Sequence, residues 1–156
     1  MKKIIIALLL ALPFTAMAAD LKIGVFNSQE VITIMPEYNA AMSELENMNL
    51  KFQTEGKKLQ EELEKKYQEY TSTAETLEPA IRQYKETELA RLQQSIQEFA
   101  TSAENNIKKK QQELMMPIIN KINQAIKKVG DENGFTYIID NAANIIPYVA
   151  PSAENV

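Results

Sequence analysis

The stretch Asp131–Ala142, DENGFTYIIDNA, decides the fold class. Gly134 is of the residue type that commonly follows the last turn of a helix, and the residues FTYII after it are aromatic or β-branched, as in a strand. The nearest convincing partner for this strand, LKIGVF at Leu21–Phe26, lies more than a hundred residues upstream, and nothing between them has a strand pattern. We therefore expect the first and last strands to share a sheet, with helix filling the interval, in an α+β fold.

The first 18 residues have the pattern of a secretory signal peptide. Lys2 and Lys3 precede an apolar run from Ile4 to Phe14, and residues 16–18, AMA, have the small-x-small pattern of a cleavage site. The apolar run is far shorter than the roughly 20 residues of a membrane-spanning helix. We expect cleavage after Ala18, export of a mature chain of residues 19–156, and no stable membrane insertion of that chain.

The composition argues against several classes of function. The chain has no cysteine and no histidine, and its net charge of −4 becomes −6 once the two leader lysines are removed. Nucleic-acid binding rests on Lys and Arg neutralising phosphates, so we expect no nucleic-acid partner. The commonest zinc ligands and the commonest general base are missing, as are phosphate-binding glycine loops and nucleophile elbows. We expect no enzymatic activity, no catalytic residues, no metal site and no cofactor.

A short helix should follow the first strand. Asn27-Ser28-Gln29-Glu30 has the pattern of a capping box, with Asn27 at the N-cap and Glu30 at N3. The helix is expected to end near Met35, because Pro36 breaks a helix or begins a new one.

Two long helical segments then form a hairpin. The outgoing segment, from Glu37 to about Leu77, consists mainly of strong helix formers. Pro79 is the next break, and the return segment runs to Pro117 and on to Gly130, an expected C-cap. Their similar lengths on either side of Pro79 predict an antiparallel coiled-coil arm that reverses at this proline.

The apolar spacing supports this arm. Apolar residues recur mostly at steps of three and four, the pattern of a coiled-coil seam. A four–four step falls at Leu59-Leu63-Tyr67, and Asn49 and Gly56 occupy places where apolar residues are expected. The predicted seam residues are Tyr38, Met42, Leu45, Phe52, Leu59, Leu63, Tyr67, Tyr70, Ala74 and Leu77, and on the return Leu89, Leu92, Ile96, Phe99, Ala103, Ile107 and Leu114.

The terminal strands form a body that is small for independent stability. Without disulfides, oligomerisation through this body is the expected remedy. The candidate interface residues are Ile23, Val25, Phe135, Tyr137 and Ile139.

The chain resembles the periplasmic chaperones of the Skp (OmpH-like) family. The resemblance covers the mature chain, and its most specific parts are KIGVFN at 22–27 and GFTYIID at 134–140, separated by this length of helix. It implies a single domain over 19–156, with a body of 19–36 and 117–156 and an arm of 37–116. It also implies a periplasmic homotrimer that holds unfolded outer-membrane proteins without ATP, with three arms enclosing a cavity.

Two consequences for partners follow. Thioethers and amphipathic rings on the arm suit adaptable contact with unfolded clients, although each could instead belong to the hairpin core. These candidates are Met42, Met48, Phe52, Tyr67 and Tyr70.

Some family members are strongly basic, whereas the arm tip here, residues 75–88, has four acidic and two basic residues. We therefore expect no recruitment of anionic lipid. The alternative function is a periplasmic coiled-coil adaptor or structural protein that docks to another envelope protein.

Overall fold

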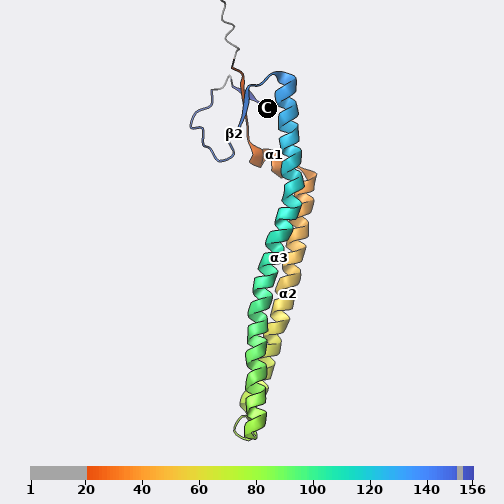
Figure 1. Cartoon of the computed structure of the whole chain (residues 1–156), viewed down its shortest axis with the longest axis vertical. Helices are drawn as coiled ribbons and strands as arrows, with labels where there is room; N and C mark the ends of the chain where they lie inside the picture. The colour runs from red at the N-terminus through yellow and green to blue at the C-terminus, as the bar shows by residue number, and fades with distance from the viewer. Residues whose placement is uncertain (1–20, 151–152) are drawn as a thin grey trace, which may run out of the picture.

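The computed structural model describes residues 21–150 and 153–156, so the predicted signal peptide lies outside the described residues. A small sheet and a short helix form a body at one end, and two long helices project from it side by side as an arm (Figure 1). In chain order the elements are β1 (Ile23–Phe26), α1 (Ser28–Ile34), α2 (Pro36–Thr73), α3 (Pro79–Asn133), β2 (Tyr137–Asp140) and β3 (Glu154–Asn155).

The prediction that the first and last strands share a sheet is confirmed. β1 is the central strand and pairs in parallel with β2, with Ile23 opposite Tyr137 and Phe26 opposite Asp140. Because parallel neighbours need a long crossover connection, the chain can place the whole helical hairpin between them. β3, which the sequence analysis did not anticipate, pairs in parallel with the other edge of β1.

The N-terminus of α1 is capped as predicted. The Oδ1 of Asn27 accepts hydrogen bonds from the backbone N–H groups of Gln29 and Glu30. The Asn27 Nδ2 donates to the Glu30 carboxylate at 2.8 Å, so the two side chains of the box bond to each other. The helix ends at Ile34, and the extended backbone of its C-cap, Met35, lets Pro36 begin α2.

The reversal at Pro79 is also confirmed. α2 ends at Thr73, four residues before the expected Leu77, and α3 begins at Pro79 with the proline in its first turn. The Arg82 guanidinium donates to the carbonyl oxygen of Ala74 at 2.6 Å across the turn. The two helices of the arm are therefore joined by a short connection, which Arg82 in the first turns of α3 stabilises.

The return segment continues past Pro117 as expected, but the predicted C-cap at Gly130 is wrong. α3 continues through both residues to Asn133, and Gly134 ends it with a left-handed φ of 67°. An interior proline removes one backbone hydrogen bond, but the next turns are held by packing, because Ile118 and Ile122 are buried. Gly130 lies against Ile138 of β2, and its carbonyl accepts from the N–H of Phe135.

The core lies where the arm joins the body. Phe26 of β1, Ala41 of α2, and Ile118 and Ile122 of α3 are buried together, with side chains of α1 packed around them. One cluster therefore joins the sheet to both long helices. Among the described residues, no helix combines the length and apolar character needed to cross a membrane.

Candidate functional surfaces

The seam of the arm follows the predicted pattern on α3 and a shifted one on α2. All seven predicted residues of the return segment are buried or half-buried. On α2 the four–four step falls at Met48-Phe52-Gly56 instead of at Leu59-Leu63-Tyr67. The buried or half-buried residues of α2 are Tyr38, Ala41, Leu45, Met48, Phe52, Gly56, Leu59, Leu63, Lys66 and Tyr70.

This shift corrects the interpretation of Met42 and Tyr67 as seam residues. Their exposed fractions are 44% and 56%, and the neighbouring Ala41 and Lys66 occupy the seam instead. The four–four step is a stutter, a local interruption of the heptad repeat. Because it comes earlier than predicted, these two side chains turn outward. Of the five candidate contact residues, Met42 and Tyr67 are therefore the accessible ones.

The other three candidates are engaged within the hairpin. Phe52 makes an edge contact with Phe99, with ring centroids 6.0 Å apart, and Met48 is half-buried on the same face of α2. The Tyr70 hydroxyl donates to the Glu86 carboxylate at 2.5 Å, and this hydrogen bond raises the pKa of Tyr70. Phe52 and Tyr70 thus connect the two helices.

Several exposed apolar side chains on the arm and just beyond its root were missed by sequence reasoning. Their positions do not fit the three–four spacing of the seam. That mismatch could have identified them from the sequence as exposed residues. They are Leu50 on α2, and Ile81, Tyr84, Met116 and Ile119 on α3, with exposed fractions between 43% and 68%. With Met42 and Tyr67 they place apolar groups near the tip, the middle and the root of the arm.

Ion pairs connect the two helices near the tip and near the root. Lys66 and Glu88 lie 2.6 Å apart, and Lys110 and Glu44 lie 2.7 Å apart. Lys121 also pairs with Glu37, the first acidic residue of α2. Hydrogen bonding to these lysines lowers the pKa of Glu88 and of Glu37. Because all of these groups are exposed or partly exposed to solvent, each pair contributes little to stability.

The outer face of the sheet is apolar and largely uncovered. The register places Ile23 beside Tyr137 and Val25 beside Ile139 on one face, since side chains alternate along a strand. Tyr137, Ile23 and Ile139 have exposed fractions of 61%, 39% and 38%. These four residues, the outer sheet face, were all predicted as interface candidates.

Phe135, the fifth interface candidate, lies on the opposite side. A side chain built at Gly24 would come within 3.0 Å of its ring, so the ring lies on the face to which Gly24 would point. The Nζ of Lys22 lies 4.3 Å from the centre of this ring. Phe135 thus packs within its own chain and does not extend the outer sheet face.

The segment 141–150 crosses from β2 toward β3 on the side of the sheet away from α3 (Figure 1). It exposes Ile145, Tyr148 and Val149, with Ile145 and Tyr148 at 77% and 75%. The Oδ1 of Asn141 holds the segment by accepting from the N–H of Ile146. Sequence reasoning assigned no role to these side chains.

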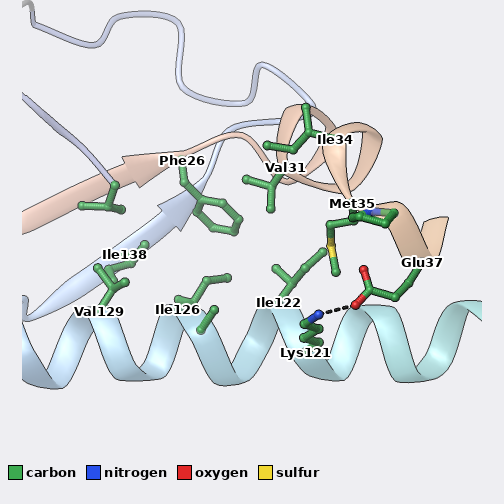
Figure 2. Close-up of a pocket in the computed structure, with 13 residues that line it drawn as sticks. Phe26, Val31, Ile34, Met35, Glu37, Lys121, Ile122, Ile126, Val129 and Ile138 are labelled. Atoms are coloured by element: carbon green, nitrogen blue, oxygen red, sulfur yellow. Dashed lines mark hydrogen bonds and ion pairs between the residues drawn. The ribbon is translucent and has the colours of Figure 1, made fainter. Parts of the chain in front are cut away.

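An apolar groove of about 430 Å³ lies between α1, the sheet and the end of α3 (Figure 2). Figure 2 shows Phe26, Val31 and Ile126 pointing into it, and the Glu37–Lys121 pair at one end. Its walls are mainly apolar and can bury an apolar side chain. In the described part of the chain, no group of acidic side chains is arranged to hold a metal ion.

Comparisons with known proteins agree over nearly the whole chain. A family model described as outer membrane protein (OmpH-like) matches residues 22–155. Chaperone protein Skp of Yersinia enterocolitica is 26% identical over 145 residues, which cover 93% of this chain and 87% of that one. Chaperone protein Skp of Photorhabdus laumondii subsp. laumondii is 28% identical over 160 residues, with coverage of 100% and 94%. Chaperone protein Skp of Pectobacterium atrosepticum is 27% identical over 149 residues, with coverage of 96% and 88%.

Proposed function

The chain belongs to the OmpH-like outer membrane protein family, and on this premise we propose that it is an ATP-independent periplasmic chaperone that holds unfolded outer-membrane proteins. The observation that carries this proposal is the scatter of exposed apolar side chains along the arm, among them Met42, Tyr67 and Tyr84. Contacts of this kind are individually weak and have no fixed geometry, so they suit many unrelated unfolded chains.

Release without ATP follows from the same feature. Each exposed side chain offers a small apolar surface, and several must act together to retain a client. A folding client that buries its own apolar residues removes these contacts one by one. No phosphate-binding loop is present in the sequence, which supports retention and release without a nucleotide.

The active form in this proposal is a homotrimer joined through the body. The outer sheet face of Ile23, Val25, Tyr137 and Ile139 is the proposed contact between copies, and its apolar exposure supports this assignment. Three arms projecting from one body would then surround the client, so that weak contacts add through high effective concentration.

We also propose that residues 1–18 are a cleaved signal peptide and that 19–156 form a single domain.

The test is suppression of aggregation. An outer-membrane barrel protein unfolded in urea is diluted into buffer with and without the mature protein, and light scattering is followed. We expect scattering to be suppressed without nucleotide, and we expect the folded barrel to show no association. Equal binding of folded and unfolded barrel would contradict the proposal and favour the adaptor function.

A further inference from the structure

Methionine is the readily oxidised side chain of this protein, because the sequence has no cysteine and no tryptophan. Of its seven methionines, Met1 and Met17 lie in the predicted signal peptide, which leaves five in the mature chain. The periplasm proposed above is an oxidising compartment. Oxidation turns the apolar thioether of methionine into a polar sulfoxide, and reductases reverse the change. Which of the five a peroxide can reach depends on the structure.

The structure divides these methionines into two groups. Met42 and Met116 have exposed fractions of 44% and 57%. Met35, Met48 and Met115 are half-buried, and Met35 and Met115 pack against the core cluster where the arm joins the body. Oxygen transfer requires contact between the peroxide and the sulfur atom, so the two exposed thioethers should react first.

The two exposed methionines lie at the same level of the arm, near its root. Two ion pairs join α2 to α3 at this level, Glu37–Lys121 and Glu44–Lys110. Met42 lies between the two glutamates along α2, and Met116 lies between the two lysines along α3. The seam at this level is filled by the buried side chains of Ala41 and Ile118. A polar group added at Met42 or Met116 therefore leaves this packing in place.

We propose that Met42 and Met116 are oxidation sites whose sulfoxides weaken the retention of unfolded clients without disturbing the fold. The proposal rests on the proposed function, in which the exposed apolar side chains of the arm contact the client. A methionine contributes to such contacts through its flexible, polarizable thioether. The oxygen of a sulfoxide accepts hydrogen bonds from water, and burying it against an apolar client surface costs free energy.

The chemistry needs a hydroperoxide as the oxidant. Its terminal oxygen is transferred to the sulfur: the O–O bond breaks, an S–O bond forms, and the peroxide leaves as an alcohol. The sulfur loses two electrons and the peroxide gains them. A methionine sulfoxide reductase with a thiol reductant restores the thioether and releases water, while the thiols become a disulfide.

The oxidation sites are mapped on the mature protein without any client. The protein is treated with tert-butyl hydroperoxide, and peptide mass spectrometry measures the sulfoxide fraction at each methionine. We expect oxidation of Met42 and Met116 ahead of the half-buried methionines, and a common rate for all of them in urea, where no side chain is protected. A common rate in the folded protein would overturn the proposal.

The effect on clients is measured after the peroxide has been removed, so that the client itself is not oxidised. The fluorescence anisotropy of a labelled, urea-unfolded outer-membrane barrel gives the Kd before and after oxidation. Because two apolar contacts are lost, we expect the Kd to rise about tenfold. The melting temperature should not change, and a methionine sulfoxide reductase should restore the Kd. An unchanged Kd, a Kd that the reductase does not restore, or a lowered melting temperature would each overturn the proposal.

Met42→Leu with Met116→Leu separates these two sites from other effects of the peroxide. Leucine is similar to methionine in size and helix propensity but has no sulfur, so the Kd of this variant should be the same before and after treatment. Met115→Leu is the matched control, because Met115 is half-buried beside Met116, and its Kd should still rise about tenfold. A similar rise in the double variant would contradict the proposal.

Failure of the proposed function would be seen separately. If the untreated protein does not bind the unfolded barrel, the chaperone function is wrong, and the switch that rests on it is wrong as well. If the untreated protein binds but the Kd does not respond to oxidation, the switch alone is wrong.

Discussion

The carboxylate of Asp140, at the end of β2, accepts a hydrogen bond from the backbone N–H of Ser28, the first residue of α1, at 3.1 Å. The same oxygen accepts from the N–H of Ala142 at 3.0 Å. One side chain therefore joins residues 112 positions apart. It satisfies an N–H group at the start of a helix, where the helix itself offers no acceptor.

Replacing this carboxylate should weaken the body. Asp140→Ala removes both hydrogen bonds, and we expect a loss of about 1 kcal/mol in the free energy of unfolding, the usual effect of losing a helix cap. Asp140→Asn is the control, because its amide oxygen can still accept both hydrogen bonds and should lose only the part of the stability that depends on the negative charge. Urea denaturation at equal protein concentration measures the difference; an unchanged midpoint for Asp140→Ala would contradict this role.

The same residue predicts a pH dependence. Burial acts to raise the pKa of Asp140, but hydrogen bonds from Ser28 and Ala142 outweigh it and hold the pKa below its usual value. A carboxyl group with a lowered folded-state pKa contributes stability above its unfolded pKa of about 3.9 and loses it as the pH falls through the folded value. The stability difference between the unmodified protein and Asp140→Asn should therefore shrink below about pH 4. A difference that persists at pH 2 would argue against this origin.

Polar substitution of the outer sheet face should dissociate the oligomer. Tyr137→Ser with Ile139→Ser removes apolar surface from the proposed contact, and burial of such surface is worth about 25 cal/mol per Å². Sedimentation equilibrium should show trimer for the unmodified protein and monomer for the double variant. Tyr84→Ser is a matched control, because Tyr84 is exposed to a similar extent as Tyr137, 68% against 61%, but lies on the arm. Trimer retained in the double variant would exclude this face as the interface.

Exposed and seam residues of the arm should respond differently. Met42→Ser with Tyr67→Ser should leave the melting temperature unchanged and weaken client retention, with further exposed substitutions adding to the effect. Phe52→Ala should instead lower stability by about 2 kcal/mol, because it leaves a gap beside Phe99 in the half-buried seam. Melting curves and the aggregation assay separate the two effects. Loss of stability in the exposed double variant would show that these side chains pack.

The tip should not bind anionic lipid. Residues 75–88 contain Glu75, Glu78, Glu86 and Glu88 against Arg82 and Lys85, and Arg82 is engaged with the carbonyl of Ala74. We expect no sedimentation with vesicles rich in phosphatidylglycerol at low salt, where attraction would be strongest. Strong binding that Arg82→Gln and Lys85→Gln abolish would contradict this prediction.

The elements of this fold were predictable where local chemistry decides them. Asn27 caps a helix, Pro36 and Pro79 begin helices, and the β-branched strands at both ends have no local partners. Gly130 was misjudged because tertiary packing outweighs its local preference: it lies against Ile138 of β2, within a helix that continues to Asn133. β3 is two residues long, too short for a period-two pattern to mark it.

The surface of the arm was less predictable. The predicted seam contained Met42 and Tyr67, whereas the observed seam contains the preceding residues, Ala41 and Lys66. This shift of one residue arises because the position of the stutter depends on how the two helices pack together. That packing involves Gly56 and Phe99, which lie on different helices and share no local sequence signal. Apolar residues outside the seam, such as Leu50 and Tyr84, were nevertheless visible in the sequence and are the better guide to exposed contacts.

The most direct test of the account uses the fact that this chain contains no tryptophan. Emission from tryptophans of an unfolded outer-membrane barrel therefore reports on the client alone during titration with the mature protein. We predict a blue shift that needs no nucleotide, saturates at one client per homotrimer, and does not occur with the folded barrel. An unchanged emission spectrum of the unfolded barrel, or the same shift with the folded barrel, would contradict the proposed holding of unfolded clients.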